Sequence, residues 1–220
     1  MAKQNIEKDP PKGDIKFSLT LSEEQKRAKE LILQKPFNFL IGQAGSGKTL
    51  LAVQIALDML FKRKVNKIVI TRPTVSTEDN GFLPGSEKEK MEPWLVPIKS
   101  NIRKVYNKPE ILTKLEENES LELVSLTHFR GRTFEDCICI VDEFQNLTKA
   151  QLQMCVGRLG KNATMIFTGD AHQIDLKFKN DSAIHDISKL DKSEWVNKII
   201  LHDNHRHESL NEILRLLNEY

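Results

Sequence analysis

The residues from Gly42 to Thr49 constrain this chain more than any other stretch, because they fit the phosphate-loop pattern G-x-x-x-x-G-K-[ST]. A short apolar run with strand character, 37–41, precedes the pattern, and apolar residues at helical spacing follow it over 50–61. Strand, glycine-rich turn and helix form the context that this pattern requires. A glycine-rich turn without a ligand is the weaker interpretation, so we predict a nucleoside-triphosphate site here.

Each part of the loop has an expected role in binding ATP. Glycines let the backbone N–H groups wrap a phosphate chain, and the N-terminus of the following helix adds partial positive charge. Lys48 is expected to reach the β- and γ-phosphates, and the Thr49 hydroxyl is expected to ligate Mg²⁺. The predicted nucleotide-binding residues of the loop are Gly42, Gln43, Ala44, Gly45, Ser46, Gly47, Lys48 and Thr49.

An apolar strand that ends in two acids, Asp142 and Glu143, supplies the second half of such a site. A carboxylate at a strand tip beside the phosphate loop can hold Mg²⁺, and its neighbour can orient and deprotonate the attacking water. We therefore assign Asp142 to the metal and Glu143 to the role of base. Gln173, beyond a later strand, is a candidate sensor of the γ-phosphate whose loop moves on hydrolysis.

Composition describes an ordinary globular protein. The 220 residues are 39% hydrophobic and 29% charged, with a net charge of +2 that does not by itself indicate a nucleic-acid binder. Three cysteines make no disulfide framework, and we predict three buried, reduced thiols. There is no apolar run near the ~18 residues of a membrane span and no signal-peptide core, so we expect a cytoplasmic protein without membrane contact.

The order of predicted elements indicates the fold class. We predict a flexible leader over 1–16 and one domain over 17–220. Further strands are predicted over 67–71, 121–126, 137–141, 164–168 and 196–201, and helices over 98–106, 109–117, 149–159 and 210–217. Buried apolar strands that alternate with helices predict an α/β domain with a mostly parallel sheet flanked by helices.

Gln25 lies in the first predicted helix, which Thr20 or Ser22 can cap and which runs to about Leu33. Its amide can donate and accept at once, as recognition of an adenine edge requires. A solvated helix glutamine is the alternative. The phosphate loop that follows favours the adenine contact.

Several loop residues suit a nucleic-acid strand. Arg72 follows a strand end, where open α/β sheets bind ligands. Within the long segment 75–97, Lys88, Lys90 and Trp94 offer charge and a stacking surface, although a helical insertion that packs on the domain fits equally well. The histidines at 202, 205 and 207 invite a metal interpretation, but they lack a cysteine and a clean tetrahedral spacing.

With these residues in view, the sequence resembles the PhoH family, phosphate-starvation-inducible-type ATPases related to superfamily 1 helicases. The resemblance runs from about Phe17 to Leu217. Its most specific parts are Arg72-Pro73, Gly81-Phe82-Leu83-Pro84-Gly85 with Lys90 and Pro93, Arg130-Gly131-Arg132-Thr133-Phe134, Asp142-Glu143-Phe144-Gln145-Asn146, and Gly169-Asp170 with Gln173 and Asp175. The sequence departs from the family at Phe144, where alanine is usual, at 78–80, and around Arg206.

The resemblance implies a RecA-like core that uses ATP and Mg²⁺. It makes Gln25 similar to the adenine-contacting glutamine of helicases and Gln173 to their γ-phosphate-sensing glutamine. Thr127 and His128, which we predict to lie in a loop beyond the strand over 121–126, resemble a helicase motif that contacts the nucleic-acid strand. We therefore expect a Mg²⁺-dependent ATP hydrolase that binds or remodels single-stranded nucleic acid, with RNA favoured over DNA. A nucleoside or other small-molecule kinase and a nucleotide-gated scaffold are the alternatives.

The resemblance also leads us to expect that the protein assembles into an oligomer. Helicases of the resembling class complete the ATP site with an arginine from a second RecA-like domain, whereas we expect one such domain here. A homo-oligomer such as a hexameric ring would let each subunit supply an arginine to its neighbour. Arg206 is the first candidate for this catalytic role, with Arg130, Arg132 and Arg158 as alternatives.

Overall fold

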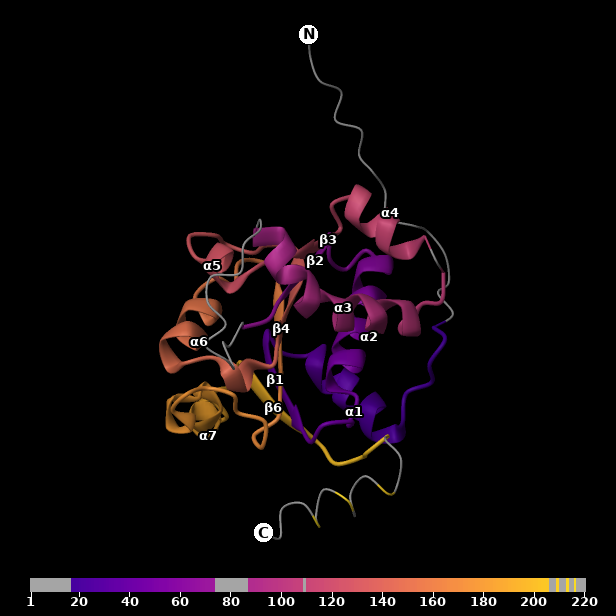
Figure 1. Ribbon diagram of the computed structural model, residues 1–220. Coiled ribbons are helices and arrows are strands. Elements are labelled where there is room, and N and C mark those ends of the chain that lie inside the picture. The colour runs from indigo at the N-terminus through magenta and orange to yellow at the C-terminus, as the bar shows by residue number, and fades with distance from the viewer. Residues whose placement is uncertain are drawn as a thin grey trace.

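Six strands build one sheet in the part of the chain that the structure describes (Figure 1). The computed structural model describes residues 17–73, 87–108, 110–205, 209, 213 and 216, and over 87–95 it describes the backbone alone. Every strand pair is parallel, and the order across the sheet is β3-β2-β4-β5-β1-β6. The strands are β1 (Phe37–Gly42), β2 (Lys67–Thr71), β3 (Leu121–Leu123), β4 (Cys137–Asp142), β5 (Thr164–Gly169) and β6 (Val196–Leu201).

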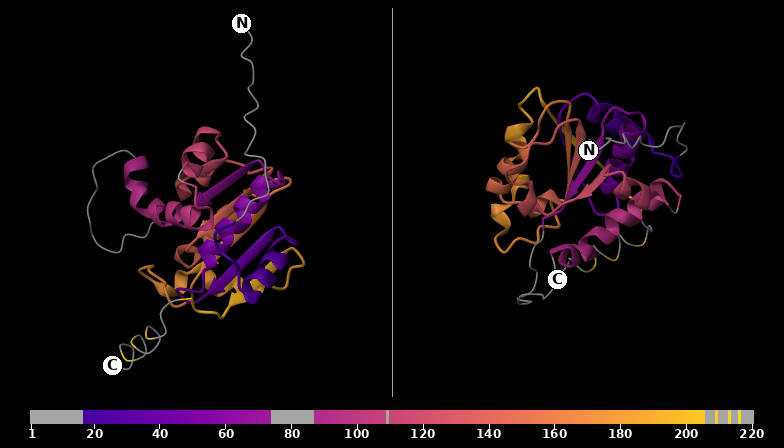
Figure 2. Two further views of the ribbon diagram at one scale, coloured as in Figure 1. Left: turned by 90° about the vertical axis from the view of Figure 1, so that its right-hand side faces the viewer. Right: turned by 90° about the horizontal axis from the view of Figure 1, so that it is seen from above.

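Helices cover both faces of this sheet, as the view from above shows (Figure 2, right). One face carries α1 (Glu23–Ile32), α2 (Lys48–Phe61), α3 (Glu87–Val105) and α4 (Ile111–Glu117). The other carries α5 (Leu126–Phe129), α6 (Lys149–Val156) and α7 (Ile187–Leu190). Three short 3₁₀ turns follow strands β4 and β5: η1 (Phe144–Asn146), η2 (Lys179–Asp181) and η3 (Ala183–Asp186). The predicted α/β class with a parallel sheet is confirmed.

Two apolar cores form because alternate residues of a strand point to opposite faces of the sheet. On β4, Ile138 and Ile140 join the core under α1–α4, while Cys137, Cys139 and Val141 join the core under α5–α7. Full burial of such a side chain contributes about 1.5–3 kcal/mol. The two cores together fix the sheet between its helical layers and hold its strand ends in place.

The helix after the phosphate loop is buried on most of its surface. Apolar residues occupy most positions of α2, and it contacts the sheet, α1 and α3. Ahead of it, α1 begins where Ser22 and Gln25 form a reciprocal capping box, which decides between the two predicted caps in favour of Ser22. A helix held on all sides gives the loop at its N-terminus a fixed base.

Most predicted elements are confirmed, and the differences have local causes. The strand predicted over 121–126 ends at Leu123, because Ser125 caps the short helix α5 through its hydroxyl and the His128 N–H, 3.4 Å apart. Thr127 and His128 therefore lie in a helix, and their prediction as loop residues was wrong. The helix predicted over 149–159 ends at Val156, and Leu159 pairs instead with Phe134 in an isolated bridge.

Other predictions lie partly outside the described residues. The leader over 1–16, Arg206 and the side chain of Trp94 are not described, and of the C-terminal helix predicted over 210–217 only residues 213 and 216 are, both helical. The second half of the segment 75–97 belongs to α3, which agrees with a helical insertion. All three cysteines are buried and free. None of the helices over the described ranges combines the length and the apolarity that a membrane crossing needs.

Candidate nucleotide-binding site

The sheet brings the separate motifs to one edge. Thr168 of β5 pairs with Leu40 of β1 on one side and with Asp142 of β4 on the other. Because all strands are parallel, their carboxyl ends lie together, so the phosphate loop after β1 meets the acids after β4 across the end of β5. Asp142 and the phosphate loop thus lie at the same edge of the sheet, and the role of Asp142 in holding a metal stays a prediction.

Two positions of the phosphate loop require glycine, because a Cβ atom there would come too close to neighbouring atoms. Gly47 is the N-cap of α2 with φ 78°, and a Cβ there would meet the Gln25 amide nitrogen at 2.8 Å. A Cβ on Gly42 would meet the Leu201 carbonyl oxygen at 2.7 Å. The N-cap residue Gly47 has no side chain to cap α2, and the helix begins with backbone N–H groups next to the loop. Such groups at a helix N-terminus are suited to phosphate oxygens.

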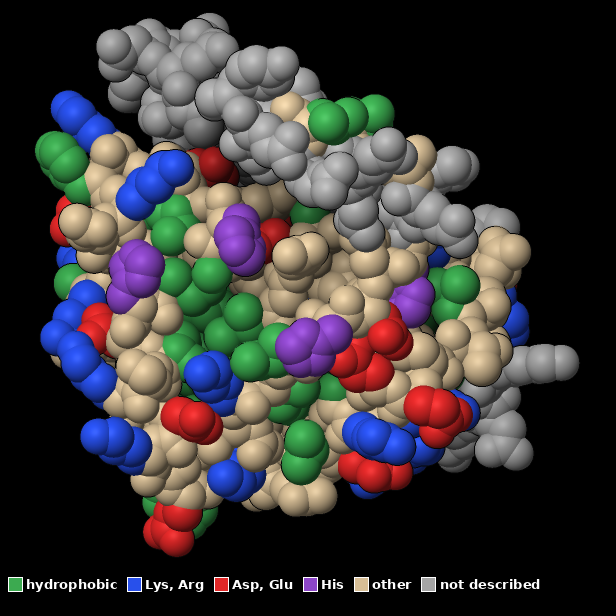
Figure 3. Space-filling model, turned by 90° about the horizontal axis from the view of Figure 1, so that it is seen from below, with side chains coloured by type: hydrophobic (Ala, Val, Ile, Leu, Met, Phe, Trp, Pro, Cys, Tyr) green, Lys and Arg blue, Asp and Glu red, His purple; other side chains and the backbone are tan. Residues whose placement is uncertain are grey.

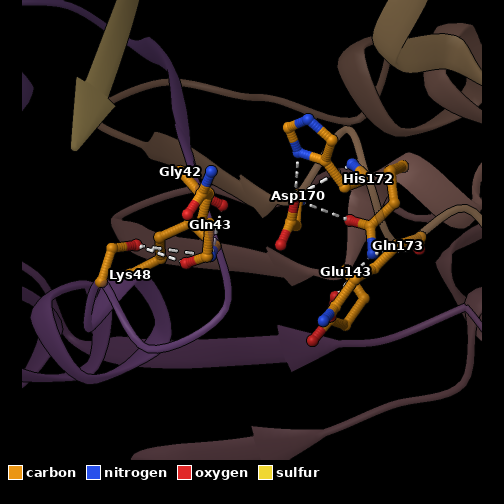
Figure 4. Close-up of polar contacts among 9 residues, drawn as sticks. Gly42, Gln43, Lys48, Glu143, Asp170, His172 and Gln173 are labelled. Atoms are coloured by element: carbon orange, nitrogen blue, oxygen red, sulfur yellow. Dashed lines mark hydrogen bonds and ion pairs between the residues drawn. The ribbon is translucent and has the colours of Figure 1, made fainter. Parts of the chain in front are cut away.

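Lys48 lies folded against its own loop (Figure 4). Its ammonium group donates to the carbonyl oxygens of Gly42 at 2.7 Å and Gln43 at 2.9 Å. A flexible four-carbon stem lets the ammonium exchange these carbonyls for phosphate oxygens. The lysine therefore lies at the loop from which it can reach a bound triphosphate.

Thr49 and Asp142 face each other. The Thr49 hydroxyl donates to Asp142 Oδ1 at 2.8 Å, and the Thr168 hydroxyl donates to the same oxygen at 2.5 Å. Asp142 is only 2% exposed. A hydroxyl and a buried carboxylate are the hard oxygen donors that Mg²⁺ prefers, usually one or two protein groups with water and phosphate completing the shell. The donor set fits that ion.

Glu143 is held by contacts on two sides. It adopts a left-handed backbone conformation, with φ 55° and ψ 43°, and its Oε2 accepts from the Gln145 amide at 2.7 Å. The Arg72 guanidinium lies 3.6 Å from Glu143 Oε1 and 3.6 Å from Asp142 Oδ2. Burial, and then the negative charge of Asp142, raise the pKa of Glu143 above its ordinary value. A raised pKa makes a carboxylate a better proton acceptor.

Gln145 and Asn146 fix the turn of Glu143 to the loop after β5. The fully buried Gln145 amide donates to the Gln173 carbonyl at 2.9 Å and accepts from the Asp170 N–H at 3.1 Å. Asn146 and Asp175 exchange two hydrogen bonds, of 3.0 and 2.8 Å. No role was expected for these amides from the sequence, because the partners of an amide in a turn depend on where the turn lies in the fold.

A hollow of about 600 Å³ adjoins the phosphate loop and contains several predicted residues. Glu143, Gln173, Gln25 and Lys48 all line it. Further lining residues had not been predicted: Leu19, Thr20, Leu21, Gln54, Asn101, Lys104 and His205. The volume lies within the usual range for small-molecule sites, roughly 300–1,000 Å³.

The Gln25 amide is already engaged in this structure. Its oxygen accepts from the Ser22 N–H at 3.2 Å, and its nitrogen lies 3.5 Å from the Ser46 carbonyl oxygen and 3.2 Å from His205 Nε2. An adenine edge would have to replace some of these contacts. The assignment of Gln25 to adenine recognition stays a prediction.

The described residues that were predicted to contact nucleic acid lie in different surroundings. Arg72 faces the two acids of the nucleotide site, whereas Thr127 and His128 are exposed on α5, beyond β3. Arg132, an alternative for the donated arginine, forms a bidentate pair with Glu122 at 2.6 and 2.9 Å. Contact of any of these residues with a strand stays a prediction.

No group of three or more His, Cys, Asp or Glu side chains within the described ranges could hold a metal ion. Of the three histidines considered for a metal, His202 and His205 are described and His207 is not. The weak metal interpretation gains no support from the first two.

Comparison with known proteins identifies the family. The family model described as PhoH-like protein matches residues 19–218. The chain belongs to the PhoH-like family. It is 36% identical over 200 residues to a PhoH-like protein of Mycobacterium leprae, covering 89% of this chain and 57% of that protein. It is 34% identical over 188 residues to Protein PhoH of Escherichia coli, covering 81% of this chain and 51% of that protein.

The chain matches only part of each PhoH-like relative. The chain spans about half the length of the relatives it matches. Among solved structures, the large terminase of a thermophilic bacteriophage superposes with a TM-score of 0.56 at 11% identity, over 92% of this chain and 51% of that chain. At that identity the likeness concerns the fold alone.

Proposed function

We propose that this PhoH-like domain is a Mg²⁺-dependent ATP hydrolase that couples hydrolysis to single-stranded nucleic acid, with RNA favoured over DNA. The observation that carries the proposal is the contact of Thr49 with Asp142 beside Lys48 and Glu143. Phosphate-binding, metal-binding and proton-accepting groups thus adjoin one hollow. Hydrolysis of a phosphoanhydride needs these three functions together.

Each residue has a distinct part in the reaction. The N–H groups at the start of α2 and Lys48 hold the triphosphate, and Thr49 and Asp142 would hold Mg²⁺. Bound there, Mg²⁺ would offset the charge that develops on the phosphate oxygens. Glu143 accepts the proton of the attacking water, and Gln145 keeps its carboxylate in place. Gln173 lies in the loop that Gln145 joins to Glu143, so a γ-phosphate contact there would be passed to the base.

Phosphate release from ATP is the direct test of the reaction type. We expect the purified protein to release free phosphate from ATP and Mg²⁺ alone, and Lys48→Ala to lose tight nucleotide binding. Lys192→Ala, which changes an exposed lysine, is the matched control. Phosphate transfer that occurs only when a nucleoside acceptor is added would instead identify a kinase.

The nucleic-acid part rests on exposed residues at the carboxyl-end side of the sheet. Thr127, His128 and Arg130 are exposed on or beside α5. We expect turnover to rise with single-stranded RNA, less with DNA, and binding to weaken as salt rises through counterion release. Equal turnover with and without either nucleic acid, together with nucleotide-dependent capture of a protein partner, would favour the scaffold alternative.

Assembly completes the proposal. We propose a homo-oligomer, such as a hexameric ring, in which Arg206 of one subunit serves the site of its neighbour. Mixing Lys48→Ala subunits with Arg206→Ala subunits should restore activity, because some interfaces then combine an intact site with an intact arginine. If mixtures that co-assemble stay inactive, Arg206 has no such role.

A further inference from the structure

A second hollow, of about 290 Å³, lies at the carboxyl ends of β1, β5 and β6. Its walls come from residues 41–43, 170–172 and 200–202. The phosphate loop borders both hollows, since its residues 42–43 line this one and its residues 44–45 and 47–49 line the nucleotide hollow. The mechanism proposed above leaves this second hollow unused.

A buried carboxylate lies in its wall. Asp170 is 3% exposed, and its Oδ1 accepts from the His172 N–H at 2.9 Å and lies 3.3 Å from His172 Nδ1. Among the described residues, Asp170 Oδ2 has no hydrogen-bond partner. Figure 4 shows Asp170 between the phosphate-loop residues Gly42 and Gln43 and the loop that carries Gln173. Oδ2 is not among the buried side-chain atoms that lack a partner, so it is accessible and can accept a hydrogen bond from a ligand in the hollow.

The rest of the wall is apolar or aromatic. Ile41 and Leu201 contribute apolar surface, and Ile200 is 46% exposed beside them. The imidazoles of His172 and His202 are exposed at the rim. In the space-filling view from below, histidine side chains gather around exposed apolar side chains (Figure 3). The hollow therefore suits a flat ring with an amino group at its edge, stacked against an imidazole.

We propose that this hollow takes one nucleobase of a bound single strand, with Asp170 accepting a hydrogen bond from the exocyclic amino group of cytosine or adenine. The inference rests on the nucleic-acid part of the proposed function and adds a site and a base preference. Carboxylates accept from amino groups at base edges, and histidine is among the side chains on which unstacked bases lie.

Two short connections would link a base bound in this hollow to the nucleotide site. Gly42 and Gln43, whose carbonyls hold Lys48, belong to its wall. The Asp170 carbonyl accepts from the Gln173 N–H at 3.1 Å, which joins the wall to the loop after β5. A base in the hollow thus contacts both the segment that restrains Lys48 and the segment that carries Gln173.

Base preference tests the site. Fluorescence anisotropy with labelled ten-residue oligo(C), oligo(A) and oligo(U) RNA should show oligo(C) and oligo(A) binding more tightly than oligo(U), by roughly tenfold for one charge-assisted hydrogen bond. Uracil presents a carbonyl oxygen where cytosine presents its amino group. In Asp170→Asn, the amide oxygen can keep the bond from the His172 N–H while its nitrogen replaces Oδ2. That variant should lose the preference or shift it toward oligo(U).

A matched pair of histidine variants separates stacking from general charge. His172→Ala should weaken binding of all three RNAs, whereas His185→Ala, at an exposed histidine of η3, should leave it unchanged. Equal affinity for oligo(C) and oligo(U), unaltered in Asp170→Asn, would overturn the base pocket and leave ATP hydrolysis and strand binding intact. Absence of binding to every RNA and DNA would refute the nucleic-acid function itself. A change of oligomeric state in Asp170→Asn, with RNA affinity unchanged, would assign the hollow to a protein side chain.

Discussion

The Thr49 hydroxyl donates to Asp142 Oδ1 at 2.8 Å although the two residues are 93 positions apart. Thr168 donates to the same oxygen from the strand between them. The start of α2 and the end of β4 are therefore joined through one carboxylate, and the two proposed Mg²⁺ ligands, Thr49 and Asp142, contact each other directly.

This contact gives a prediction about Mg²⁺. Thr49→Val keeps the shape of the side chain but removes the hydroxyl, so one metal ligand is lost while Asp142 keeps its bond from Thr168. We expect the Mg²⁺ concentration for half-maximal ATP turnover to rise by about tenfold or more. Thr164→Val, at the opposite end of β5, is the control. If Thr49→Val and Thr164→Val need the same Mg²⁺ concentration for half-maximal turnover, Thr49 is not a metal ligand.

Gln145 gives a prediction about positioning. Gln145→Leu leaves the Asp170 N–H and the Gln173 carbonyl without their partner and frees the Glu143 carboxylate. We expect turnover to fall by about 100-fold, since small misplacements of a reacting group have effects of that size. ATP affinity, measured by equilibrium binding, should change little. The free energy of unfolding should fall by about 1–3 kcal/mol, because two buried backbone groups lose a partner.

Two comparisons make the Gln145 result decisive. Gln153→Leu, at an exposed position of α6, should leave turnover and stability unchanged. Gln145→Glu keeps the length of the side chain but places a second carboxylate against Glu143, so it should not rescue turnover. If Gln145→Leu turns over ATP at the parental rate, Glu143 does not depend on Gln145 for its position.

Arg72 gives a prediction that separates two roles. Its guanidinium faces Asp142 and Glu143, and its side chain is 23% exposed. If the arginine serves the nucleotide site, Arg72→Ala should lower turnover without RNA by about tenfold or more, since one charge-assisted contact is worth ~1.5–3 kcal/mol. Arg72→Lys should recover part of this, because a point charge replaces a planar fork. Loss of RNA affinity with unchanged RNA-free turnover would instead support the strand-contact role predicted from sequence.

A fourth prediction concerns stability and pH. Burial alone would raise the pKa of Asp58, but hydrogen bonds and charge from Lys29 and Lys62 outweigh it and hold that pKa below its ordinary value. A carboxylate whose folded pKa is lowered stabilises the fold above its unfolded pKa, about 3.9, and this contribution disappears as the pH falls through the folded value. Asp58 joins α2 to α1 through Lys29.

Urea unfolding at several pH values measures this contribution. At pH 7 we expect Asp58→Asn to lower the free energy of unfolding by about 1–3 kcal/mol. The difference from the parental protein should shrink below pH 4 and vanish once Asp58 is protonated in both states. Asp181→Asn, at an exposed acid of η2, is the control. A difference that stays constant down to pH 2 would exclude the ion pair as its cause.

The fold and the outline of the site could be predicted from the sequence because each depends on local patterns of residues. The phosphate loop has one compatible context, and β2 and β6 have the predicted limits because apolar β-branched runs end at proline or polar residues. The position of Asp142 beside the loop could be predicted in the same way, because it is an acid at a strand tip in a chain that carries a phosphate loop.

The remaining features depend on contacts that span the sheet. The Gln145 amide bonds to Asp170 and Gln173, far along the chain, and no local pattern indicates those partners. Arg72 was expected to face a nucleic-acid strand, and its position against two acids became visible only with β2 and β4 side by side. Likewise, the second hollow exists only because β5, β1 and β6 are neighbours.

Turnover and nucleotide affinity of Glu143→Gln test the central claim most directly. The substitution keeps the size and hydrogen-bonding reach of the side chain but removes the proton acceptor. We predict ATP affinity within about threefold of the parental protein, since a base acts mainly in the transition state, and turnover lowered by about 10²–10⁴. Glu194→Gln, at an exposed acid before β6, should match the parental protein in both measurements. Hydrolysis of ATP by Glu143→Gln at the parental rate would contradict the account.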